Sequence, residues 1–227
     1  MIQASADGSR IGDLSRNFRI QPLTLTIVNL PAPGKVIVVA FDMCSSSTII
    51  EQLTLKGELK RFQRLLTVVE RYLNNKQNVL SFEVYKFVGD GWILLFPENT
   101  EGKYLLQFLK DLCVFFKREL RKEVLQHLDS TPEITGLTFG LEKGVLGTML
   151  MNSKKEYVGR AINVACRLQN AIKDKGGSPA YKALVTNTVY NDHFAPATGF
   201  RVFKVDRTLR NIGGGAVFRC RKIDLVS

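Results

Sequence analysis

The chain has 227 residues, 45% of them hydrophobic, and carries a formal net charge of +11. This length and composition suit one globular domain with a sizeable core, and neither a low-complexity segment nor an internal repeat is present. The longest apolar runs, 36–41 and 92–96, are much shorter than the roughly 18 residues that suggest a membrane span. Charged residues also interrupt the first 30 positions, which excludes the layout of a signal peptide. We therefore expect a soluble, cytoplasmic protein that has no membrane partner.

The positive charge is spread along the chain, as in the basic pairs 117–118, 154–155 and 221–222. These residues do not alternate with aromatics as they do in a stacking platform, so we expect no nucleic-acid partner. Two explanations remain open: a solvated basic surface, or a positive field that attracts a substrate with several phosphates. The four cysteines are widely spaced and the chain has two histidines, so we expect free thiols rather than a zinc site or a disulfide framework.

Hydrophobic periodicity and turn residues predict the order of elements. Pro31 and Pro33 block regular structure, so residues 1–34 are interpreted as an N-terminal arm and residues 35–227 as one folded domain. Alternating or β-branched apolar segments predict strands, and apolar residues three or four apart predict helices. The expected elements are strand 35–41, helix 49–73 with a division at Gly57, strands 79–88 and 92–96, helix 101–128, strands 134–141 and 145–150, helix 160–171, strand 183–185, a helix near Thr188, and strands 200–205 and 216–223.

Two hairpins are expected within this order, with turns at 89–91 and 142–144. The succession of elements indicates an α+β fold in which helices flank a mostly antiparallel sheet.

Two aspartates occupy strand ends in this scheme. Asp42 follows a buried strand and precedes a serine-rich turn, where it could simply cap a helix. Asp90 lies 48 residues later, between two glycines at a hairpin tip, where it could simply form a turn. Taken together, the two carboxylates can meet at one end of adjacent strands, where they repel each other unless a hard cation neutralises them. Two such metal ions can activate an attacking oxygen and stabilise a leaving one.

A polar pair interrupts the helix predicted over 160–171. Asn163 and Arg167 are four residues apart, so they share one face of an otherwise small and apolar helix. They are either part of an exposed amphipathic stripe or a functional pair, in which the amide orients a sugar and the guanidinium stabilises phosphoryl charge.

Three blocks in this order resemble the class III adenylyl and guanylyl cyclase catalytic domain. Residues 41–43 (Phe-Asp-Met) resemble its first metal-binding motif, 86–91 (Lys-Phe-Val-Gly-Asp-Gly) its second, and 157–168 the motif that carries an asparagine and an arginine for the transition state. Residues 140–144 also resemble the family's dimerisation-arm region. The resemblance covers about residues 35–223, and it implies a class III cyclase-like fold with a cyclase catalytic domain at 35–227.

The resemblance also implies a role for each matching position. It assigns two Mg²⁺ or Mn²⁺ ions to Asp42 and Asp90, with the Met43 carbonyl as a further ligand. It assigns catalytic roles to Asn163 (ribose) and Arg167 (α-phosphate). The other positions that it matches are the base-recognition residues Lys86 and Glu156 and the phosphate-binding residue Arg210, which stands where the family usually has a lysine.

The turn after Asp42 departs from the family pattern. The usual Gly-Phe-Thr is replaced by Cys44 and the run Ser45, Ser46, Ser47, whose amides and hydroxyls could still cradle phosphates at a helix N-terminus. Glu156 also stands where adenylyl cyclases have Asp or Thr; it is either a longer base-recognition residue or a solvated loop residue. With the Lys86–Trp92 block, this turn resembles the bacterial pyrimidine cyclases of antiphage (Pycsar) signalling.

The residues themselves leave the base open. Lys86 donates and Glu156 accepts, and that pair fits uracil, cytosine and adenine alike. The narrower resemblance favours UTP over CTP, and both over ATP. The expected protein is a homodimeric cyclase that binds a nucleoside triphosphate between subunits. The alternatives are an adenylyl cyclase, a catalytically silent cyclase-like module, or a polymerase-like nucleotidyl transferase, which the Asn163 and Arg167 helix does not favour.

Overall fold

The computed structural model describes residues 34–172, 178–196 and 199–226. The predicted N-terminal arm lies outside these residues except for Gly34, which begins the first strand. Within the described ranges, no helix is long and apolar enough to cross a membrane.

The strands of these ranges form an eight-stranded sheet in the order β2-β3-β1-β4-β6-β8-β7, with β5 paired to β4. All pairings are antiparallel except β4 with β6, which confirms the predicted mostly antiparallel α+β architecture. The strands are β1 (Gly34–Cys44), β2 (Glu83–Val88), β3 (Gly91–Pro97), β4 (Gly136–Met151), β5 (Lys154–Val158), β6 (Lys182–Thr186), β7 (Arg201–Thr208) and β8 (Val217–Asp224).

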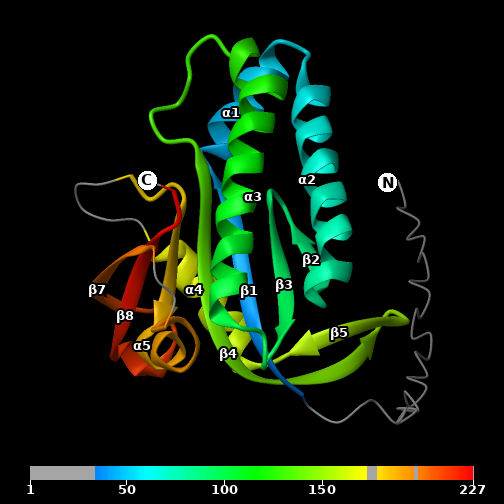
Figure 1. The fold of residues 1–227 in the computed structure, drawn as a ribbon. Helices are drawn as coiled ribbons and strands as arrows, with labels where there is room; N and C mark the ends of the chain where they lie inside the picture. The colour runs from blue at the N-terminus through cyan, green and yellow to red at the C-terminus, as the bar shows by residue number, and fades with distance from the viewer. Residues whose placement is uncertain (1–33, 173–177, 197–198, 227) are drawn as a thin grey trace, which may run out of the picture. The chain divides into compact units, whose positions relative to one another are not determined.

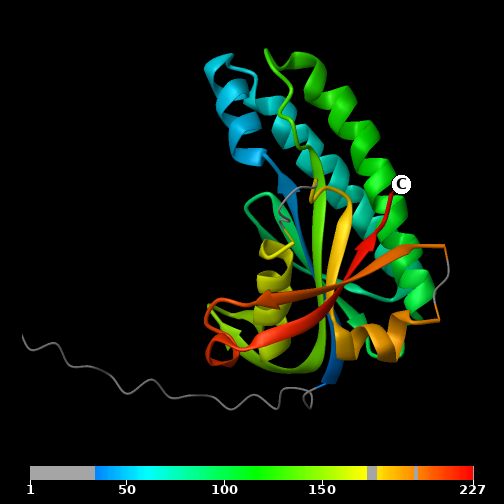
Figure 2. The same cartoon turned by 90° about the vertical axis from the view of Figure 1, so that its left-hand side faces the viewer.

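Helices cover both faces of the sheet. The long helices α2 and α3 lie side by side on one face, and α4 packs on the other (Figures 1 and 2). The helices are α1 (Ser46–Leu55), α2 (Leu59–Leu80), α3 (Gly102–Glu123), α4 (Arg160–Asn170) and α5 (Asn187–Val189); short 3-10 segments span Leu125–His127 and Gly213–Gly215, and a π-helical turn spans Tyr190–Phe194.

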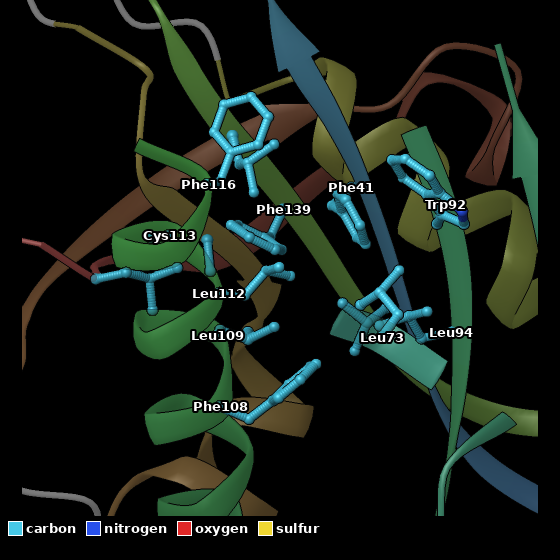
Figure 3. Packing of buried hydrophobic residues seen from close by; sticks show 14 of the residues in the cluster. Phe41, Leu73, Trp92, Leu94, Phe108, Leu109, Leu112, Cys113, Phe116 and Phe139 are labelled. Carbon is cyan, nitrogen blue, oxygen red and sulfur yellow. The ribbon is translucent and has the colours of Figure 1, made fainter. Parts of the chain in front are cut away.

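The main core lies between the sheet and the α2–α3 layer (Figure 3). Phe41 of β1 stacks on Trp92 of β3, with ring centroids 5.4 Å apart, and contacts Phe139 of β4 at 5.5 Å. From α3, Leu112 and Phe116 point into the same layer. Burial of each large side chain stabilises the fold by roughly 1.5–3 kcal/mol, so this layer holds β1, β3 and β4 in a fixed relation.

Helix α4 lies unusually close to β4. A Cβ atom at Gly140 would overlap the carbonyl oxygen of Ala165, and one at Gly144 would come within 3.0 Å of the Ala161 Cβ. Glycine at these two positions therefore lets the helix backbone approach the strand. The position of α4 on the sheet depends on this contact.

The predicted hairpin at 142–144 is wrong, because β4 runs without a break from Gly136 to Met151. Gly144 stays in register with Val36 of β1; it is needed for the approach of Ala161 and not for a turn. The turn instead lies at Asn152 and Ser153, which have positive φ angles of 51° and 60°, and it leads into β5, a strand that the sequence did not predict.

The predicted start of the second strand is also too early. Val79 and Leu80 are the last residues of α2, and Ser81, with a φ of 54°, ends the helix before β2 begins at Glu83. Leu80 lies seven residues after the buried Leu73 and continues the apolar face of the helix, whereas Val79 is exposed on its other side.

We predict that Gly140→Ala destabilises the protein, because the added methyl group must push α4 away from β4. The expected loss in the free energy of unfolding is about 1–3 kcal/mol, measured by urea denaturation. Gly147→Ala is the matched control on the same strand, since its Cβ would lie 3.6 Å from Val158 in ordinary contact. Equal urea midpoints for the two variants would contradict the close-packing argument.

Candidate active site

Asp42 and Asp90 lie at the same end of adjacent strands, as the sequence predicts. The antiparallel register pairs Phe41 with Trp92, so Asp42 stands opposite Gly91. A Cβ on Gly91 would overlap the Phe41 carbonyl oxygen and lie 3.0 Å from Asp42 Oδ1. Only glycine fits between the strands here, and this close approach brings Asp90 beside Asp42.

The turn before β3 presents the second carboxylate. Gly89 has a φ of 71° and begins a two-residue turn, in which the Asp90 amide donates to the Val88 carbonyl at 2.9 Å. Asp90 Oδ2 is buried and has no hydrogen-bond partner among the described residues. A buried carboxylate oxygen without a partner is costly, and a bound cation would satisfy it.

Two neighbouring cavities, of about 540 and 330 Å³, open beside these aspartates. The larger one is lined by the predicted metal and phosphate residues Asp42, Met43, Ser45, Ser46 and Ser47, and the smaller one by Asp42 and Asp90.

The serine-rich turn uses one of its hydroxyls to hold itself in place. Ser45 has a positive φ of 57°, and its hydroxyl donates to the Ile134 carbonyl at 2.7 Å. The proton of Ser45 Oγ is thus engaged with the loop before β4. Ser46 and Ser47 begin α1 and line the larger cavity, where their hydroxyls and amides can donate to an anion.

Three polar lining residues escaped the sequence analysis: Thr138, Gln169 and Asn170. Gln169 Nε2 donates to Thr138 Oγ1 at 2.7 Å, and Thr138 Oγ1 donates to the Asp42 carbonyl at 3.4 Å. The sequence contained a sign that Gln169 faces the sheet. It follows Ala161 and Ala165 at four-residue spacing, so it is the polar member of the helix face that packs on the sheet. This chain of bonds connects α4 to the strand end that carries Asp42.

Lys86 and Glu156 form a second cluster, away from the lining of both cavities. Lys86 Nζ of β2 lies 2.8 Å from Glu156 Oε2 of β5, and Tyr85 also donates its hydroxyl proton to this oxygen. Two hydrogen bonds lower the pKa of Glu156: the larger effect comes from Lys86 and the smaller one from Tyr85. The hydrogen bond to Glu156 in turn raises the pKa of Lys86. The alternative of a solvated loop residue is wrong for Glu156, which belongs to a strand and is 22% exposed.

Asn163 and Arg167 lie on the exposed side of α4, one turn apart, whereas the residues that pack on the sheet are Ala161, Val164, Ala165 and Leu168. Neither Asn163 nor Arg167 lines the two cavities. Leu209 packs in the same cluster as Val164 and Leu168, which places the exposed Arg210 next to α4.

The chain therefore presents its polar residues in two sets. One set, around Asp42 and Asp90, offers oxygen ligands for cations and donors for phosphates. The other polar residues lie outside the lining of both cavities: the ion pair of Lys86 with Glu156, which suits the polar edge of a planar base, and the outward-facing Asn163 and Arg167 of α4. No cluster of three or more His, Cys, Asp or Glu side chains occurs in the described ranges. Mg²⁺ needs only one or two carboxylates when substrate phosphates supply further ligands, so the pair fits a metal carried with a phosphorylated substrate.

No protein-family model matches the sequence, and no curated protein matches it either. Solved structures do match. The adenylyl cyclase CyaB of P. aeruginosa aligns over 84% of this chain and 94% of its own, with a TM-score of 0.60 and 14% identity. The guanylyl cyclase Cya2 aligns over 84% and 92% (TM-score 0.57, 17% identity). An adenylate cyclase of Trypanosoma brucei aligns over 86% and 92% (TM-score 0.60, 15% identity). The chain thus has the fold of these cyclases, and the predicted class III cyclase-like fold is confirmed.

A buried carboxyl group lies beneath α4. Glu142 stands on β4 between Gly140 and Gly144, is 7% exposed, and has an Oε2 atom without a hydrogen-bond partner in the part of the chain described. Burial raises its pKa, and the Thr186 side chain, the Lys143 amide and the Arg160 guanidinium offset only part of this rise. The protonated form of Glu142 is therefore more favoured in the native state than in the unfolded chain, and the stability that this contributes is lost as pH rises above the ordinary value of 4.5.

We predict that Glu142→Gln raises the thermal midpoint at pH 7.5, because a neutral amide of similar size removes the cost of keeping an ionisable carboxyl group buried at that pH. The expected gain is about 1–3 kcal/mol, or roughly 2–8 °C, and it should shrink toward zero below pH 4.5. The exposed Glu70→Gln is the matched control and should show no pH-dependent difference from the parent. Melting curves from pH 4 to pH 8 measure both; a gain that is constant over this range would contradict the assignment.

Proposed function

We propose that this chain is a nucleotide cyclase that converts a nucleoside triphosphate to its 3′,5′-cyclic monophosphate and pyrophosphate. The observation that carries the proposal is the buried, unpartnered Asp90 Oδ2 beside Asp42, at cavities lined by phosphate donors. The fold shared with adenylyl and guanylyl cyclases supports it. In the reaction, the 3′-oxygen loses its proton and bonds to the α-phosphorus, and the bond from that phosphorus to the bridging oxygen breaks in line.

Asp42 and Asp90 would hold two divalent cations, Mg²⁺ or Mn²⁺, with the Met43 carbonyl as an additional ligand. When bound, these ions supply activation of the 3′-hydroxyl and neutralisation of phosphate charge. The chain's own donors would hold the rest of the triphosphate: Ser46, Ser47 and the first-turn amides of α1 beside the carboxylates, and the exposed Arg210 next to α4. Asn163 would orient the ribose, and Arg167 would stabilise charge that develops on the α-phosphate.

The geometry of α4 supports a shared site. Asn163 and Arg167 face outward and away from the lining of the cavities beside Asp42, so one chain offers the metal residues and the transition-state residues on different surfaces. A second copy would bring them together, as two composite sites in a homodimer. The β4–β5 ribbon suits this contact because its apolar residues are exposed: Met149, Leu150, Met151 and Val158 are 36–51% exposed.

The base is proposed to be a pyrimidine, with UTP preferred over CTP, and the product to be a second messenger in bacterial antiphage defence. This part of the proposal is supported by the resemblance of the serine-rich turn and the Lys86–Trp92 block to Pycsar cyclases. The contact of Lys86 with Glu156 offers one donor and one acceptor, an arrangement that adenine also satisfies. Adenylyl cyclase activity is therefore the alternative that the substrate assay must separate.

We predict that the purified protein, given equimolar ATP, GTP, CTP and UTP with Mn²⁺, forms cyclic UMP as its main product, identified by mass spectrometry. A site built around hydrogen bonds rejects bases that leave a buried polar group unpaired, by up to about 10⁴-fold. Asp42→Ala and Asp90→Ala should each abolish the product while the thermal midpoint shows a folded protein. A dominant cyclic AMP product would reject the pyrimidine assignment alone, whereas activity within a few-fold of the parent in either folded variant would reject the metal pair.

Mixing inactive variants tests the shared site. Asp42→Ala and Arg167→Ala should each be inactive alone, but a mixture under subunit exchange should regain up to about a quarter of parent activity, because a mixed dimer keeps one intact composite site. Native mass spectrometry of the two variants, distinguished by mass, shows whether exchange has occurred. No recovery after demonstrated exchange would overturn the shared-site proposal.

A further inference from the structure

Tyr85 lies at a bulge in β2. The register of β2 against β3 shifts between Val84 and Lys86, with Tyr85 between them. Neighbouring residues of a regular strand point to opposite faces, but Tyr85 and Lys86 both reach Glu156 Oε2. The bulge therefore aims two consecutive side chains at one carboxylate oxygen.

The Tyr85 hydroxyl is held from two sides. It donates to Glu156 Oε2 at 2.5 Å and accepts the Tyr157 amide proton at 3.0 Å, so it joins β2 to two successive residues of β5. Its ring meets the Tyr157 ring edge-on at 5.0 Å and packs against the apolar cluster between β1, β3 and α4. Lys86, in contrast, has a side chain that is 47% exposed. Tyr85 is thus the rigid one of the two groups that orient Glu156.

This arrangement determines which atoms remain for a ligand. Glu156 Oε2 accepts from both Tyr85 and Lys86, so Oε1 is the oxygen left to accept from a base N–H group. Lys86 is an ammonium with three donors, of which this contact uses one. A carboxylate whose plane is fixed by two donors presents Oε1 in one direction, and fixed polar groups discriminate between ligands better than mobile ones.

Resting on the proposed cyclase function, we propose that Tyr85 is a positioning residue for base selection, which orients Glu156 so that its free oxygen reads the base. The hydroxyl touches Glu156 and the β5 backbone, and its effect on the substrate passes through Glu156. Loss of the hydroxyl leaves Glu156 tethered only by a mobile lysine, so affinity for the preferred base and discrimination against the others should fall together.

Tyr85→Phe tests this role, since it removes the hydroxyl and keeps the ring. For the preferred triphosphate we expect KM to rise about ten- to hundredfold, which corresponds to the free energy of one charge-assisted hydrogen bond. We expect kcat to change less than about threefold. Tyr85 also helps to lower the pKa of Glu156, so this pKa should rise when the hydroxyl is removed. In a plot of 1/KM against pH, the fall on the acid side should therefore begin at a higher pH in the variant. The ratio of kcat/KM between preferred and rejected triphosphates should fall by a similar factor.

Tyr157→Phe is the matched control. Its hydroxyl donates to Glu83 at 2.7 Å, and the variant keeps the backbone amide that donates to Tyr85. The control should retain the parent's base discrimination and the pH at which 1/KM falls on the acid side. Parent-like discrimination in Tyr85→Phe, or an equal loss in Tyr157→Phe, would overturn the positioning role.

Equilibrium binding separates this inference from the proposed catalysis. Each of the four nucleoside triphosphates is titrated into the parent and into Tyr85→Phe in the presence of Ca²⁺. If the parent makes no cyclic product but binds one base preferentially, and Tyr85→Phe loses that preference, the cyclase proposal fails and the positioning role stands. A parent without any base preference, or a variant that keeps it, overturns the positioning role.

Discussion

The contact between α4 and β4 is the constraint on which the site depends. Gly140 and Gly144 remove side chains where the helix backbone crosses the strand, so Ala165 and Ala161 sit directly against it. This approach is what lets Gln169 reach Thr138 and, through it, the end of β1 at Asp42. The helix that presents Asn163 and Arg167 outward is thus connected on its inner side to the strand end that carries Asp42, and a shift of α4 would disturb both.

The two sets of polar residues differ in how they are satisfied before any ligand binds. Beside Asp42, the Asp90 Oδ2 atom is buried and has no hydrogen-bond partner among the described residues, which favours arrival of a cation. Lys86 and Glu156 instead form an ion pair with each other, so a base that binds there as proposed must fit a pair that already exists. Under the proposed function, the first set would therefore gain most from the charge of its ligand, and the second would select by the direction of its hydrogen bonds.

Local patterns in the sequence predicted β1, the β2–β3 hairpin, α2, α3 and α4, because these elements follow a simple period and end at clear turn residues. The meeting of Asp42 with Asp90 followed from strand order alone. What failed depended on contacts between distant segments: Gly144 looked like a turn but accommodates Ala161, and β5 is specified by its pairing with the end of β4. The bulge at Tyr85 leaves no local signature, since its reason is Glu156 on another strand.

The structure gives a reason for a glutamate rather than an aspartate at position 156. Its carboxylate spans from β5 to two donors on β2, and an aspartate there would be shorter by one methylene, which is enough to lengthen both hydrogen bonds beyond a useful range. The structure shows that the same length anchors Glu156 on Tyr85 and Lys86. If Glu156 recognises the base as proposed, a substitution there that alters base preference must also rebuild the contact with β2.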